Sequence, residues 1–306
     1  MVTAGEDLTI RMWVPTIKGE VQSFKGHSAK IRSVCFSPTN TGLLASGSND
    51  KTIKLWSVDR STAKSAEKPP KIGTFLKSFY NLHTNWIRSV RFSSDGNMLV
   101  SASDDNSMVV LDVRSYKTVA KIPCHLGTPL FADFNPCASH YIGTCTMDQC
   151  FTIYDLRKSQ LVQVYQKLQK GAINKFAFHP SGDFAATVGD DATIKILDLV
   201  EGRPIYTLHG PREALYAVAF SHDGGLLATA GNDREVLIWE PNLPSRGGGG
   251  DNNDEEGKEN EMGSSSQQSS DSSMTDTLSN VSRSSRNKTV ASSSASSSGF
   301  NYTSGR

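Results

Sequence analysis

Residues His27 to Trp56 read HSAKIRSVCFSPTNTGLLASGSNDKTIKLW, and this stretch decides the fold. Three short runs of alternating apolar and polar residues lie at 31–38, 44–50 and 52–56. Alternation interrupted by Pro, Gly, Asn and Asp is typical of small antiparallel strands joined by tight turns. The stretch therefore predicts a β-meander.

The same stretch recurs along the chain. Aligning the copies on one turn aspartate gives steps of 43, 55, 43, 43 and 42 residues, for Asp7, Asp50, Asp105, Asp148, Asp191 and Asp233. Ser or Thr stands four residues before each aspartate, at Thr3, Ser46, Ser101, Thr144, Thr187 and Thr229. Six residues after it stand Trp13, Trp56, Leu111, Tyr154, Leu197 and Trp239. An upstream histidine is present at His27, His83 and His125 but is replaced by Gln169 and Pro211.

This period, with its Gly-His start and Trp finish, resembles the WD-repeat family of β-propellers, in which each blade is one four-stranded sheet. The resemblance implies an all-β propeller with six blades represented, four of them complete. We expect three strands, four sheets of four strands, and three strands again, which makes 22 in all. We also expect the sequence to lack about one and a half N-terminal repeats, so that the full-length protein would have seven blades.

The repeated residues form a chain of donors and acceptors running from indole to hydroxyl, imidazole and carboxylate. Only one repeat has the whole set, in His27, Ser46, Asp50 and Trp56. A satisfied buried relay of this kind fixes the geometry of a turn. The blades with Leu111, Leu197 or Pro211 at a relay position are expected to depend more on apolar packing. A hydrolase triad would be needed once, whereas this set recurs with the blades, so its interpretation is structural.

Composition bounds the function. The chain has 306 residues, of which 37% are hydrophobic and 21% charged, and a formal net charge of +1. This balance does not indicate nucleic-acid binding. Residues 245–306 hold six basic and eight acidic residues, so the repeats carry a small basic excess and the tail a small acidic one.

The five cysteines form no CxxC pair, and Cys145 and Cys150 have no second pair to complete a zinc site. No secretory signal and no apolar run of 18 residues is present, so we expect a cytoplasmic protein without membrane contact, metal or cofactor. Two domains are expected. Residues 1–244 form the propeller, and 245–306 form a disordered Gly/Ser-rich acidic tail with few apolar residues.

Three residues are candidates for partner binding. Trp86 and Arg88 lie where a strand begins after a loop, and Arg32 is the equivalent of Arg88 in the preceding repeat. Trp and Arg are enriched in interface hot spots. The alternative is that Trp86 packs between neighbouring blades.

A second set is Arg114 and Arg157, in the endings Leu111-Asp112-Val113-Arg114 and Tyr154-Asp155-Leu156-Arg157. These resemble the W-D-x-R endings of propellers that act as substrate receptors of cullin ubiquitin ligases. In such propellers the arginine contacts the ligase adaptor, so both arginines are alternative adaptor contacts.

Four segments indicate a particular family among the WD-repeat proteins: residues 13–20, 83–92, 178–182 and 194–210. Over residues 1 to about 244 the chain is similar to the proteome of centriole protein 1 family, and it departs from that family at Gln169 and Pro211. In that family a seven-bladed propeller precedes a linker and a C-terminal coiled coil, for which no heptad stretch is present here. Its members reside in centrioles and basal bodies on the microtubule triplets.

The resemblance implies a non-catalytic scaffold of centrioles or basal bodies that supports centriole integrity, centriole duplication and cilium assembly. Its partners would be centriolar proteins, with tubulin as a further candidate, and the oligomeric state is open. The alternative from another class is the cullin ligase receptor. An enzyme is disfavoured because no metal set, phosphate loop or singular nucleophile is present.

Overall fold

The computed structural model describes residues 1–13, 21–40, 42–58 and 74–244. Every regular element in these ranges is a strand and none is a helix, which confirms the predicted all-β class. The insertion after Trp56 and the Ser-rich tail, for which sequence patterns gave predictions, lie outside the described residues. The chain divides into two units, Met1–Pro244 and Ser245–Arg306, and only the first is described below.

The described residues form 22 strands in six antiparallel sheets, as the repeat count predicts. Two sheets have three strands: β1 (Val2–Ala4), β2 (Thr9–Trp13) and β3 (Val21–Lys25); and β20 (Leu215–Phe220), β21 (Leu227–Gly231) and β22 (Val236–Trp239). The other four sheets have four strands. They are β4 (Ile31–Phe36), β5 (Leu43–Ser48), β6 (Ile53–Ser57) and β7 (Thr74–Phe79); β8 (Ile87–Phe92), β9 (Met98–Ser103), β10 (Ser107–Asp112) and β11 (Thr118–Pro123); β12 (Pro129–Phe134), β13 (Tyr141–Thr146), β14 (Phe151–Asp155) and β15 (Gln160–Tyr165); and β16 (Ile173–Phe178), β17 (Phe184–Gly189), β18 (Thr193–Asp198) and β19 (Arg203–His209).

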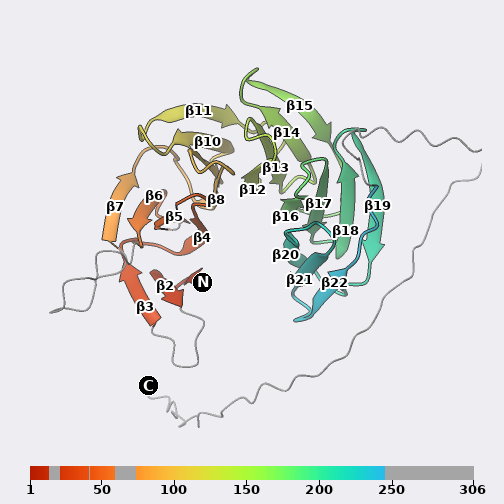
Figure 1. The fold of residues 1–306 in the computed structure, drawn as a ribbon, viewed down its shortest axis with the longest axis horizontal. Coiled ribbons are helices and arrows are strands. Elements are labelled where there is room, and N and C mark those ends of the chain that lie inside the picture. Colours follow the sequence, from red (N-terminus) through yellow and green to blue (C-terminus); the bar gives the residue numbers. More distant parts are fainter. Residues whose placement is uncertain (14–20, 41, 59–73, 245–306) are drawn as a thin grey trace, which may run out of the picture. The chain divides into compact units, whose positions relative to one another are not determined.

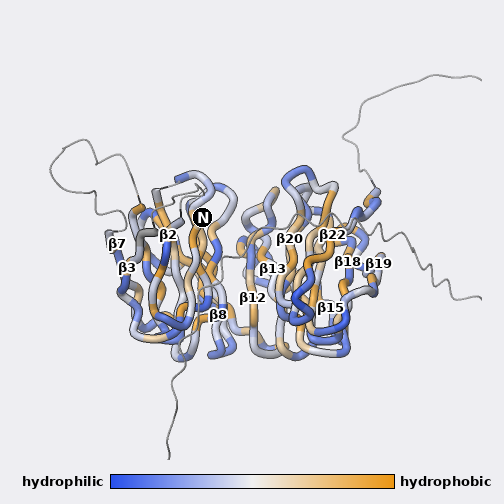
Figure 2. The backbone as a smooth tube through the Cα atoms, turned by 90° about the horizontal axis from the view of Figure 1, so that it is seen from below, coloured by the Kyte–Doolittle hydropathy of each residue, from blue (hydrophilic) through white to orange (hydrophobic). Residues whose placement is uncertain are grey.

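The six sheets, called blades 1 to 6 in chain order, pack one against the next through their first strands (Figure 1). A separate hydrophobic cluster fills the space between each pair of consecutive blades. Burying one large apolar side chain contributes about 1.5–3 kcal/mol, so these five clusters hold the blades together. Figure 2 shows hydrophobic segments running through the blades and hydrophilic residues gathered at the turns.

The turn between the second and third strands of each blade has one backbone signature. The residue after each turn aspartate has a positive φ, between 58° and 68°, in all six blades: Leu8, Lys51, Asn106, Gln149, Ala192 and Arg234. In five blades the aspartate accepts the backbone N–H two residues further on, a local bond that favours this turn. Asp148 of blade 4 is the exception among the described residues.

These turns share one face with the starts of the inner strands. The backbone N–H of Asp104 donates to the carbonyl of Trp86 at 2.9 Å, and Asn49 and Asp190 bond in the same way to Lys30 and Ala172. We call this the aspartate face. Because strands alternate in direction, the turns between third and fourth strands lie on the opposite face.

Candidate protein-binding surface

The relay of blade 2 is buried beneath the aspartate face. His27 Nδ1 donates to Asp50 Oδ2 at 2.8 Å, Ser46 Oγ donates to His27 Nε2 at 2.7 Å, and Trp56 Nε1 donates to Ser46 Oγ at 2.8 Å. Burial opposes ionisation of Asp50, but hydrogen bonds from His27 and Thr52 outweigh it and hold the pKa of Asp50 far below its usual value. The relay therefore closes the turn with an ionised carboxylate.

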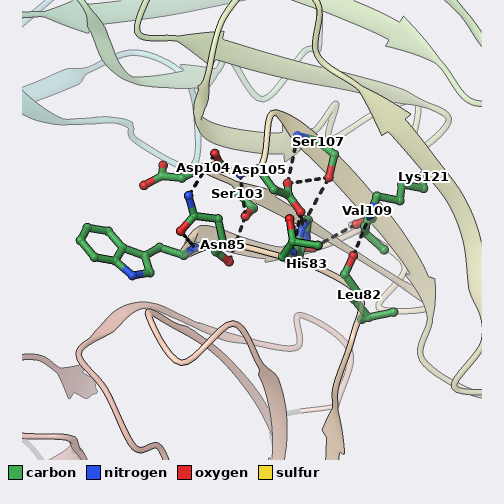
Figure 3. Close-up of polar contacts among 12 residues, drawn as sticks. Leu82, His83, Asn85, Ser103, Asp104, Asp105, Ser107, Val109 and Lys121 are labelled. Atoms are coloured by element: carbon green, nitrogen blue, oxygen red, sulfur yellow. Dashed lines mark hydrogen bonds and ion pairs between the residues drawn. The ribbon is translucent and has the colours of Figure 1, made fainter.

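Blade 3 has a shorter relay, because Leu111 stands where blade 2 has tryptophan. His83 bonds Asp105 at 3.0 Å and Ser101 at 2.8 Å, and the Ser107 hydroxyl donates to Asp105 at 2.7 Å (Figure 3). Burial lowers the pKa of His83, although Asp105 acts in the opposite direction. The histidine relay therefore forms without an indole donor.

Blade 5 has glutamine in place of the histidine. The Gln169 side-chain amide donates to the carbonyls of Thr187 and Thr193 at 3.4 and 3.1 Å. Gln169 Oε1 and Thr187 Oγ1 are buried without a hydrogen-bond partner among the described residues. An unpaired buried polar atom costs about 1–3 kcal/mol, so this blade carries a defect that the histidine blades avoid.

The relay hydroxyl of blade 2 is committed to structural contacts. Ser46 is fully buried, and its hydroxyl is occupied by both His27 and Trp56. No group of three His, Cys, Asp or Glu residues in the described ranges could hold a metal ion. None of the described residues belongs to a helix long and apolar enough to cross a membrane.

The structure brings Trp86, Arg32 and Arg88 together on the aspartate face. The guanidinium carbon of each arginine lies 5.9 Å from the centroid of the Trp86 ring, although the two arginines come from different blades. Trp86 remains 43% exposed. Cation–π contacts favour an orientation of the indole between the two guanidinium groups, so the Arg32–Trp86–Arg88 surface presents an aromatic ring flanked by two positive charges to solvent. Trp86 packs across a blade boundary and faces solvent at once.

The two arginines differ in their charge balance. Arg88 makes a bidentate pair with the Asp104 carboxylate at 2.6 and 2.7 Å, a strong geometry for this pair. Arg32 donates to the neutral side-chain oxygen of Asn49 at 3.1 Å. The Asn85 side chain accepts from the backbone of Trp86 and donates to the carbonyl of Asp104 (Figure 3). The Arg32–Trp86–Arg88 surface therefore has an ion-paired half at Arg88. Arg32 makes no ion pair among the described residues and interacts at longer range with the Glu6 carboxylate.

Two further exposed residues of the aspartate face were not identified as candidates from the sequence. Tyr216 is 53% exposed and stands at the strand position that Arg32 and Arg88 occupy in their blades. Met147 is 49% exposed and directly precedes the turn aspartate of blade 4. Comparison of equivalent repeat positions could have identified both.

Arg114 and Arg157 lie on the opposite face. Each follows the third strand of its blade, and its backbone N–H bonds the carboxylate two residues before it, at 2.9 Å in Arg114 and 2.8 Å in Arg157. Both side chains are exposed, and Arg157 lies 5.9 Å from the centroid of the Tyr141 ring. They belong to consecutive blades and share no surface with Trp86.

Fold and surface together define a propeller-type repeat protein with an exposed interaction face. The family model for the WD domain, G-beta repeat, matches residues 18–57, 73–112, 160–198 and 202–240, which make up just over half of the sequence. The chain belongs to the WD-repeat family. Members of this family are generally protein-interaction scaffolds rather than catalysts.

The curated relatives are distant and longer. Striatin-3 of Bos taurus is 26% identical over 274 residues, covering 80% of this chain and 33% of the relative. Nuclear distribution protein PAC1 of Arthroderma otae is 25% identical over 244 residues, covering 70% of this chain and 50% of the relative. Nuclear distribution protein nudF of Emericella nidulans is 26% identical over 214 residues, with coverages of 63% and 45%. The chain thus spans a third to a half of their lengths.

Proposed function

We propose that this protein is a non-catalytic scaffold that binds a partner protein through the Arg32–Trp86–Arg88 surface. The observation that carries the proposal is the 43% exposure of Trp86 between two guanidinium groups. A large aromatic ring held rigid before binding loses little conformational entropy when it is covered. This combination is typical of an interface hot spot.

The charges favour an acidic partner. Arg32 makes no ion pair among the described residues, and the Glu6 carboxylate that interacts with it at longer range is paired with Lys30. A carboxylate of the bound protein can therefore pair with Arg32 beside the Trp86 ring. Tubulin, whose surface is acidic, is a partner of this chemistry, as are acidic segments of centriolar proteins. Attraction between opposite charges would also raise the association rate.

We place this scaffold at centrioles or ciliary basal bodies, within the cytoplasmic cytoskeleton. The placement rests on the sequence resemblance to the centriolar propeller family, and not on striatin-3, PAC1 or nudF. There it would support centriole integrity, duplication and cilium assembly. The partners under this proposal are centriole proteins or microtubule-triplet tubulin.

Localisation and binding test the two halves of the proposal separately. The tagged chain should form foci on centrioles that persist after microtubule depolymerisation. Trp86→Ala should weaken capture of purified tubulin or of the centriolar partner by at least tenfold, because it removes the ring that both arginines flank. Leu161→Ala, which trims another side chain of similar exposure (48%), should not. A diffuse fluorescence signal would contradict the centriolar localisation. Equal capture of the partner by Trp86→Ala and Leu161→Ala would contradict binding through the Arg32–Trp86–Arg88 surface.

A cullin ligase receptor is the second candidate. Its supporting observation is that Arg114 and Arg157 are exposed at equivalent turns of two consecutive blades, on the face opposite Trp86. Capture of the ligase adaptor by the wild-type chain, lost in Arg114→Ala/Arg157→Ala, would support this function. Absence of capture by the wild type removes it.

A further inference from the structure

A pocket of about 500 Å³ opens on the aspartate face between blades 3 and 4. We call it the His125–Asp148 pocket. It is separate from the Arg32–Trp86–Arg88 surface, because none of those three residues lines it. Its walls come from the turn of blade 3, the loop leading into β12 and the turn of blade 4, and are made by Asn106, Pro123, Cys124, His125, Gly127, Thr128 and Asp148.

His125 and Asp148 occupy the sequence positions of a relay that does not form. In the described part of the chain neither side chain has a hydrogen-bond or ion-pair partner, and both are exposed. The hydroxyl of Thr144, which would bond the histidine, donates instead to the carbonyl of Phe131 at 3.0 Å. Cys150 stands where blades 2, 3 and 5 have a Thr or Ser hydroxyl that bonds the turn aspartate. His125 therefore stands at the repeated sequence position without making the contacts that His27 and His83 make.

The polar groups of the pocket are set in place by the backbone around them. Thr128 donates to the side-chain oxygen of Asn106 at 2.8 Å, and the backbone N–H of Cys124 donates to the Asn106 carbonyl at 2.8 Å. Gly127 has a φ of 109°, and a Cβ there would collide with the Asp148 carboxylate. Only glycine permits this close approach, so the loop leaves Asp148 directed along the pocket wall.

Cysteine, histidine and aspartate in one pocket suggest nucleophilic chemistry, but Cys124 does not fit that role. Burial, with a further contribution from Asp105, raises the pKa of the Cys124 thiol to about 12. A nucleophile or metal ligand must be a thiolate at neutral pH. The groups that remain are acceptors and one planar ring: the Asp148 carboxylate, the Asn106 amide oxygen and the His125 imidazole.

We propose that the His125–Asp148 pocket binds an arginine side chain of a partner peptide. A guanidinium group presents several donors in one plane, which match the Asp148 carboxylate and the Asn106 amide oxygen. The exposed imidazole of His125 offers a flat surface on which that plane can stack. Asp148 is the one carboxylate among the lining residues, which suits a single monovalent group. Nothing in this inference depends on the acidic partner proposed for the Arg32–Trp86–Arg88 surface.

The test uses the full chain and two pentapeptides, acetyl-Gly-Gly-Arg-Gly-Gly-amide and the same peptide with uncharged citrulline in place of arginine. Ring signals of the histidines are followed by NMR, and the signal of His125 is assigned from its absence in His125→Gln. The arginine peptide should shift the His125 signal saturably, and the citrulline peptide should not. Asp148→Asn should weaken binding about tenfold, as loss of one charge-assisted contact does.

Two further variants control for charge and for the other surface. Asp233→Asn removes the same charge from the equivalent turn of blade 6 and should leave arginine-peptide binding unchanged. Trp86→Ala should also leave it unchanged, so that failure here is distinct from failure of the proposed function. Equal shifts with both peptides, or equal loss in Asp148→Asn and Asp233→Asn, would overturn the assignment of the pocket.

Discussion

Blades 2 and 4 both have four strands and the same turn conformation, but the hydrogen bonds of their turn aspartates differ. The residue after the turn aspartate has nearly the same φ in both, 68° at Lys51 and 65° at Gln149. In blade 2 the aspartate is joined to His27, Ser28 and Thr52. In blade 4 the described residues give Asp148 no such bond. The turn geometry therefore does not require the relay.

Aromatic packing accompanies the loss of the relay in blade 4. Phe176 contacts Phe131 and Phe151 with ring centroids 5.3 and 4.9 Å apart, and all three rings are buried. Edge-to-face aromatic pairs add about 0.5–1.5 kcal/mol beyond area burial. Aromatic contacts therefore contribute to the packing at the boundary of blades 4 and 5. Of the relay positions in blade 4, His125 and Asp148 face solvent, whereas Thr144 is buried.

The largest expected difference between blades 2 and 4 is the loss of stability when the turn aspartate is replaced by alanine. Asp50→Ala deletes four hydrogen bonds, one of them from the relay histidine His27, and should lower the free energy of unfolding by about 3 kcal/mol. Asp148→Ala deletes none among the described residues and should change it by less than about 0.5 kcal/mol. Urea denaturation of both variants measures the difference.

Asp233→Ala is the control for this pair, since Asp233 accepts one backbone N–H and no relay histidine. It should fall between the other two variants. Equal destabilisation by Asp50→Ala and Asp148→Ala would show that the aspartate acts through turn propensity alone. The contrast between the blades would then have no energetic meaning.

The fold could be predicted from the sequence because the turn and strand signals repeat. The aspartate, the Ser or Thr before it and the alternating strands gave the number of sheets and of strands correctly. Local bonds and strand period produce these features, and both are visible in one repeat. Among the four-stranded blades, the repeat signal is weakest in blade 4. The segments that the WD-domain family model matches leave out residues 113–159, which include most of this blade.

The surfaces were only partly predictable. Trp86, Arg32 and Arg88 were singled out by residue type, yet their stacking depends on the packing of blade 2 against blade 3. The His125–Asp148 pocket was missed because His125 matches the repeat pattern in sequence. The Thr144 hydroxyl bonds the Phe131 carbonyl rather than His125, and this tertiary contact is not encoded in the spacing.

Acid should weaken blade 2 before blade 4. The pKa of Asp50 in the folded state is far below its value of about 3.9 in the unfolded chain. Stability from this group is therefore present above about pH 4 and is lost as the pH falls from there toward the folded pKa. Between pH 5 and pH 2.5 the loss should reach roughly 1–2 kcal/mol.

Urea midpoints at several pH values measure this loss. Asp50→Ala should show a flatter pH dependence than the wild type, whereas Asp148→Ala should keep the wild-type slope. Parallel curves for the wild type and Asp50→Ala would mean that other carboxylates account for the acid sensitivity.

The smallest expected effect is a gain, from repair of the relay in blade 5. Gln169→His should place an imidazole between the Thr187 hydroxyl, now unpaired, and the Asp191 carboxylate. Blade 3 shows that such a relay forms with leucine in place of tryptophan, as Leu197 is here. Removing the unpaired Gln169 Oε1 and giving Thr187 Oγ1 a partner should raise the free energy of unfolding by about 1 kcal/mol. Adding Thr187→Ala should abolish the gain, and a gain that survives it would show that better packing, not the hydroxyl bond, is responsible.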